Sequence, residues 1–166
     1  MLVRSTRTAA ALAVLLGLLA ATLVLRSSAS AQDPGPRTLT FTELERGATF
    51  THIRNTKGAK RQSNLQGDIL AFTNLLADSS GKRVGKISVS CTTTTGARNF
   101  LKSTLTCVGV LTLADGSLTL QANTRPNSRT TTAAVTGGTG AYANARGVMV
   151  SEEGRSGSQD TITLVD

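Results

Sequence analysis

The residues of this chain that are best suited to chemistry lie near its C-terminus, in the stretch AAVTGGTGAYANARGVMV at residues 133–150. Three glycines precede a ring, an amide and a guanidinium, and these residues are Gly137, Gly138, Gly140, Tyr142, Asn144 and Arg146. A glycine-rich segment of this kind either cradles a phosphate with its backbone amides or closes a tight hairpin. The side chains after it offer the donors, the charge and the apolar surface with which a pocket orients a small ligand.

The residues that follow the glycines argue against a phosphate site. A phosphate loop needs a helix after it, because the helix N-terminus supplies the aligned amides. The segment AYANARGVMVS alternates like a strand instead, and no Gly-Lys-Ser/Thr ending is present. The sequence therefore predicts a hairpin whose glycines supply positive φ angles between Val135 and Tyr142.

The strand expected after this hairpin has two unlike faces. Before Met149, one face carries only alanine and glycine, which lets another layer of protein approach closely. The other face carries Tyr142, Asn144 and Arg146 among valines. Two interpretations of this mixed face stay open, since its polar residues either line a ligand pocket or point into solvent.

The rest of the chain consists of short segments rich in Thr and Val that alternate between apolar and polar residues. The predicted strands are residues 38–43, 48–53, 67–74, 83–94, 99–114, 117–124, 130–136, 141–151 and 158–165. Turn signals separate them, and no segment has helical spacing for more than about a turn and a half. Many short strands at close spacing predict an all-β sandwich or barrel, and the pattern alone leaves both open.

The two cysteines, Cys91 and Cys107, are predicted to form a disulfide. Each alternates in phase with apolar residues, and a turn near Asn99 would bring them opposite each other in one hairpin. Closing this loop would stabilise the fold by roughly 3 kcal/mol. The spacing is not C-x-x-C and His52 is the only histidine, so neither a redox motif nor a metal site is expected.

The N-terminus predicts export. Residues 1–31 combine basic residues, a long apolar run and the small residues Ala29 and Ala31, which is typical of a secretory signal peptide cleaved after Ala31. We therefore expect a secreted protein without a stable membrane anchor, an uncleaved anchor being the alternative. Residues 32–37 then form a flexible N-terminal segment, and residues 38–166 form one domain with a core of its own.

Charge and composition exclude some functions. Residues 32–166 hold fifteen basic and ten acidic residues, a moderate excess that keeps a domain soluble. The basic segment RNTKGAKRQ at residues 54–62 lacks the aromatic rings that bind single-stranded nucleic acid, so we expect it to stay solvated. The G-x-S-x-G motif of serine hydrolases is absent from the sequence.

The C-terminal stretch resembles dirigent proteins and their allene oxide cyclase-like relatives, whose motif runs V-x-G-G-T-G-x-[FY]-x-x-A-R-G. The matching residues are Val135, Gly137, Gly138, Thr139, Gly140, Tyr142, Ala145, Arg146 and Gly147. A second family motif, G-D-x-x-x-F followed by V-G, is matched by Gly67, Asp68, Phe72, Val84 and Gly85. The resemblance covers about residues 65–166, with both motifs in the family's order.

The resemblance implies an eight-stranded antiparallel β-barrel, commonly assembled as a homotrimer, whose lumen binds a hydrophobic small molecule. Members of the family steer the coupling or cyclisation of a reactive molecule without a cofactor, an isomerase-like activity that rests on confinement. The residues expected to bind the ligand are Tyr142, Asn144, Arg146, Asp68 and Phe72.

This chain also departs from the family. Catalytic members tend to keep an acidic pair, often where this chain has Thr73 and Asn74, and the glycine segment is followed here by Ala141. No catalytic residue is therefore assigned from the sequence. A lipocalin-like carrier and an exported structural or surface domain stay open as alternatives. A buried carboxylate facing Tyr142 or Arg146 would favour catalysis, whereas a purely apolar lumen would favour carriage.

Overall fold

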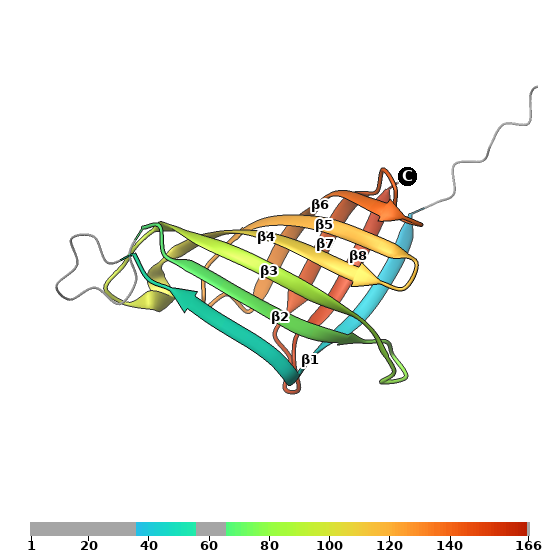
Figure 1. Ribbon diagram of the computed structural model, residues 1–166, viewed down its shortest axis with the longest axis horizontal. Coiled ribbons are helices and arrows are strands. Elements are labelled where there is room, and N and C mark those ends of the chain that lie inside the picture. Colours follow the sequence, from blue (N-terminus) through green and yellow to red (C-terminus); the bar gives the residue numbers. More distant parts are fainter. Residues whose placement is uncertain (1–35, 56–65, 166) are drawn as a thin grey trace, which may run out of the picture. The chain divides into compact units, whose positions relative to one another are not determined.

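A computed structural model describes residues 36–55 and 66–165, and these form a closed barrel of antiparallel strands in chain order (Figure 1). The strands are β1 Arg37–Ile53, β2 Ile69–Ala77, β3 Arg83–Thr95, β4 Thr104–Leu113, β5 Gly116–Thr124, β6 Thr130–Gly140, β7 Arg146–Glu152 and β8 Gln159–Val165. The predicted all-β class and eight-stranded barrel are confirmed. The ring closes where β1 pairs with β8, with Leu39 opposite Ile162 and Phe41 opposite Asp160.

Several predictions fall on other parts of the chain. The signal peptide, most of the N-terminal segment and the centre of the basic loop, residues 56–65, lie outside the described residues. Arg37, expected in the N-terminal segment, is already the first residue of β1. Within the described ranges, no helix is long and apolar enough to cross a membrane.

The interior of the barrel follows the alternation of the sequence. In β8 every second residue is buried, and Asp160, Ile162 and Leu164 point inward. The main core gathers Leu76, Leu111, Leu118 and Ile162 around the buried Tyr142. A second, smaller cluster joins Leu70 and Leu105 to the two cysteines.

Strand β1 is one long, bent strand where the sequence predicted two. Its pairing register with β2 shifts between Leu44 and Thr49, and Gly47 has a φ of 88°. The Arg46-Gly47 signal therefore marks a bulge and not a turn, because pairing with β2 continues on both sides of it. Residues 37–42 pair with β8, whereas residues 42–44 and 49–53 pair with β2, and Figure 1 shows the bend of β1.

The predicted glycine hairpin turn is wrong in its position. Gly137 and Gly138 lie within β6 and pair with β5, and the turn to β7 is formed by residues 141–144. Strand β7 begins at Arg146 and not at residue 141. A side chain at Gly138 would overlap the carbonyl oxygens of Tyr142 and Ser117, so this glycine serves a close backbone approach.

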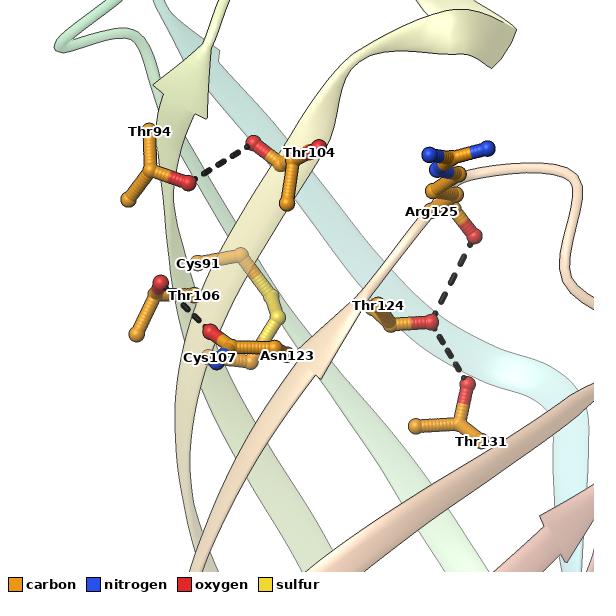
Figure 2. The surroundings of a disulfide bond; sticks show 9 residues. All are labelled: Cys91, Thr94, Thr104, Thr106, Cys107, Asn123, Thr124, Arg125 and Thr131. Atoms are coloured by element: carbon orange, nitrogen blue, oxygen red, sulfur yellow. Dashed lines mark hydrogen bonds between the residues drawn. A yellow bond between two sulfur atoms is a disulfide. The ribbon is translucent and has the colours of Figure 1, made fainter.

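The predicted disulfide is confirmed. Cys91 and Cys107 are direct register partners on β3 and β4 and are joined by an S–S bond (Figure 2). The chain between them turns at Asn99, whose side chain accepts a hydrogen bond of 3.0 Å from the Leu101 backbone N–H. A short 3-10 helix, Phe100–Lys102, follows, so β4 begins at Thr104 and not at residue 99.

Candidate functional site

A cavity of about 360 Å³ lies inside the barrel. Its apolar wall comes from β2 to β5 and includes the disulfide, with Phe72, Ile87, Val89, Cys91, Leu105, Cys107, Leu120 and Ala122 as lining residues. Residues from the β5–β6 and β7–β8 loops also line it, and both loops lie at the same end of an up-and-down barrel. The volume lies in the range of small-molecule sites, about 300–1,000 Å³.

A polar band crosses four neighbouring strands on the other side of the interior, and it consists of Asn74, Glu43, Asp160 and Ser151 on β2, β1, β8 and β7. Ser151 is the register partner of Asp160, and Glu43 is two residues beyond the β1 partner of Asp160. The Asn74 amide donates a hydrogen bond to the Glu43 carboxylate. Glu43, Asn74 and Ser151 line the cavity, whereas Asp160 is only 1% exposed.

The environment of Asp160 keeps its proton bound near neutral pH. Burial raises the pKa of this carboxyl from 3.8 to about 7, and the negative charge of Glu43 contributes in the same direction. The nearby Ser151 hydroxyl lowers the pKa in part, although neither Oδ atom has a well-formed hydrogen bond to any residue that the structure describes.

The structure brings one of the predicted ligand-binding residues to this cavity. Phe72 lines the apolar wall. Asp68 is buried outside the lining of the cavity, where its carboxylate accepts a hydrogen bond of 2.6 Å from the Asn55 backbone N–H. Its other oxygen lies 3.2 Å from Nε2 of His52, which gives that histidine an acidic neighbour that its sequence surroundings did not indicate.

The three residues of the glycine-rich motif lie elsewhere. Tyr142 is buried in the main core, and its hydroxyl donates a hydrogen bond of 3.4 Å to Asp115. Burial and then the charge of Asp115 raise the pKa of the Tyr142 phenol. Asn144 and Arg146 are exposed, and the Arg146 guanidinium donates to the Ala145 carbonyl at 2.8 Å. Of the two interpretations of this face, the one that places Asn144 and Arg146 in solvent describes their positions.

Sequence reasoning missed Glu43 and Asp160. A signal for both is present in the sequence, because Glu43 continues the inward phase of Leu39 and Phe41 on β1. Asp160 likewise alternates in phase with Ile162 and Leu164. An acidic residue at an inward position of a predicted barrel strand marks a buried carboxyl.

No protein-family model matches the chain, and no curated protein has a similar sequence. Solved structures are similar in fold. The structure of "Pyocyanin demethylase" superposes with a TM-score of 0.63 at 22% identity, over 78% of this chain and 100% of that one. The pterocarpan synthase dirigent protein PsPTS1 gives a TM-score of 0.57 at 18% identity, over 81% of this chain and 97% of that one.

A third similar structure is a heme-binding cyclase that catalyses a 4 + 2 cycloaddition, with a TM-score of 0.54 at 13% identity over 100% of this chain and 84% of that one. Identities this low show a common fold. They agree with the resemblance found in residues 65–166 of the sequence. The chain therefore folds as an eight-stranded barrel of the dirigent and cyclase type.

Proposed function

We propose that this protein is an exported barrel that binds a hydrophobic small molecule in its cavity and steers the coupling or cyclisation of that molecule by acid–base catalysis. The observation that carries the proposal is the buried Glu43–Asp160 pair beside an apolar cavity. Burying carboxyls costs stability unless they are fully paired, so such pairs concentrate at functional sites. Export is supported by the disulfide, which persists in oxidising compartments.

In the proposed chemistry, the two carboxyls have different roles. Glu43 faces the cavity and exchanges a proton with the ligand, while Asp160 holds a proton behind it. The raised pKa of Asp160, about 7, suits a group that holds or releases a proton near neutral pH behind the residue that meets the ligand. The apolar wall confines the ligand so that one folded geometry reacts, and this mechanism needs no cofactor.

Binding is tested with N-phenyl-1-naphthylamine, a neutral dye whose fluorescence rises in apolar surroundings. We expect the protein to bind it, and Ala133→Phe to weaken binding at least about ten-fold, because the larger side chain fills the space that the dye needs. Ala133 is buried and lines the cavity, whereas the adjacent Ala134 is exposed, so Ala134→Phe is the matched control. A native protein that fails to bind the dye would contradict the proposed cavity function.

The acid–base role is tested with 5-nitrobenzisoxazole. A carboxylate removes the ring C–H proton, the freed electron pair forms a nitrile, and the N–O bond breaks to release a coloured phenolate. We expect Glu43→Gln to slow this reaction about ten-fold, since it removes the base that faces the cavity.

The control for this measurement is Glu45→Gln, which alters an exposed carboxyl on the same strand. If Glu43→Gln binds the neutral dye normally and reacts at the native rate, the acid–base role is wrong. The non-catalytic carrier is then the better description.

A homotrimer is the second part of the proposal. The outer face of β1 to β4 is lined by small side chains such as Ala71 and Ser90 together with Val108, which is 55% exposed. Such a face suits close contact with another subunit. We expect native mass spectrometry to give a trimer and Val108→Lys to shift it toward the monomer, whereas Val148→Lys on β7 leaves it intact. A native protein that is monomeric under these conditions would rule the trimer out.

A further inference from the structure

We infer that the ligand is an organic anion, with an apolar body in the cavity and a negatively charged group held by Arg125 and Arg129. This inference rests on the proposed binding of a small molecule. It adds the chemical class of that molecule, which neither the fold nor the acid pair indicates.

The two arginines belong to the loop between β5 and β6, and both line the cavity. They are exposed, as expected for residues at an opening. Pro126 and Ser128 of the same loop line the cavity between them. Any ligand in the cavity therefore lies within reach of this loop.

Hydrogen bonds hold the backbone of the loop. The Ser128 N–H donates to the Arg125 carbonyl at 3.0 Å, and the Glu153 N–H donates to the Arg129 carbonyl at 2.8 Å. The Thr124 hydroxyl, which lies 2.8 Å from that of Thr131, joins the two strands next to the loop (Figure 2). The backbone that carries Arg125 and Arg129 is thus held in place at the edge of the cavity.

The β5–β6 loop carries positive charge that is free to bind an anionic ligand. Within residues 36–55 and 66–165, the one ion pair joins His52 to Asp68, so neither Arg125 nor Arg129 is paired with a carboxylate there. Of the loop residues that line the cavity, Glu153 contributes one negative charge, and Arg125 and Arg129 contribute two positive charges. Cations at the opening of a low-dielectric cavity attract anions more strongly than cations on an open surface do.

The polar band determines which way such a ligand lies. The Glu43–Asp160 pair carries negative charge and repels an anionic group, whereas the arginines attract it. The ligand is therefore oriented with its charged end at the β5–β6 loop and its apolar body against the disulfide wall. That orientation leaves the uncharged part of the molecule to meet Glu43.

Two dyes that differ only by a sulfonate test this inference. We expect Arg125→Gln/Arg129→Gln to weaken binding of 8-anilinonaphthalene-1-sulfonate about ten-fold, because the variant loses two partly exposed ion pairs with the sulfonate. The same variant should bind N-phenyl-1-naphthylamine as tightly as the native protein does. The control is Arg83→Gln/Lys86→Gln, which removes the same charge from exposed residues of β3 outside the cavity lining. Dodecanoate should also displace the neutral dye from the native protein better than dodecanol does.

The outcomes separate the two proposals. If the neutral dye binds but the sulfonate dye is unaffected by the loop variant, or is affected equally by the control, the anionic ligand is wrong and the cavity function stands. If neither dye binds the native protein, the proposed function itself fails. If the double variant no longer binds the neutral dye, Arg125→Gln and Arg129→Gln are tested singly, and the same outcomes apply to each.

Discussion

An Asp160→Asn variant is expected to be more stable than the native chain at about pH 8, by up to about 4 kcal/mol. The folded pKa of Asp160 is about 7 against an ordinary value of 3.8, so the folded state binds the proton more tightly than the unfolded state. The native chain then has its full stability from this group below 3.8 and loses it as the pH rises to about 7. Asparagine is neutral at every pH and avoids that loss.

The measurement is the free energy of unfolding in urea across this pH range. The gain should shrink toward acid pH, where aspartate is protonated in both states. Glu152→Gln, which removes an exposed carboxyl on β7, is the control and should show no comparable pH dependence. An Asp160→Asn variant less stable than the native chain at about pH 8 would contradict the assigned proton.

Removing the disulfide is expected to lower the free energy of unfolding by about 3 kcal/mol, the chain-entropy cost of opening a loop of this length. Cys91 and Cys107 are separated by 16 positions and are both buried. Urea unfolding of Cys91→Ala/Cys107→Ala measures the loss. A reducing agent should destabilise the native chain by a similar amount and leave the double variant unchanged.

An outward pair on the same two strands is the matched control for this experiment. Lys86 and Thr112 are register partners on β3 and β4, and both are exposed. Lys86→Ala/Thr112→Ala should therefore change stability little and should not respond to reduction. Equal losses in the two double variants would show that the disulfide itself contributes nothing.

The barrel and the disulfide could be predicted because their signals are local. Alternation along each strand fixes which residues face inward, and a single hairpin brings Cys91 opposite Cys107. The bend of β1 and the place of the β6–β7 turn could not be predicted in the same way. A glycine that forms a bulge at Gly47, or allows close approach at Gly138, resembles a turn glycine in sequence.

The candidate site depends on contacts between distant parts of the chain. Phe72 was predicted from a motif, but Glu43 and Asp160 meet only because β1 pairs with β8. The phase of each strand is visible in the sequence, whereas the register between the first and last strands is not. That register, and the size of the cavity, decide which inward carboxyls lie side by side.

The position of Glu43 and Asp160 across the ladder that closes the ring links assembly to activity. Before β1 meets β8, an open sheet can already contain the disulfide and most of the leucine core, yet its two acids lie at opposite edges. Closure of the barrel and formation of the Glu43–Asp160 pair are therefore one event. A chain in which β1 is not paired with β8 cannot carry out the proposed chemistry. Only molecules with a closed barrel contain the acid pair that this chemistry requires.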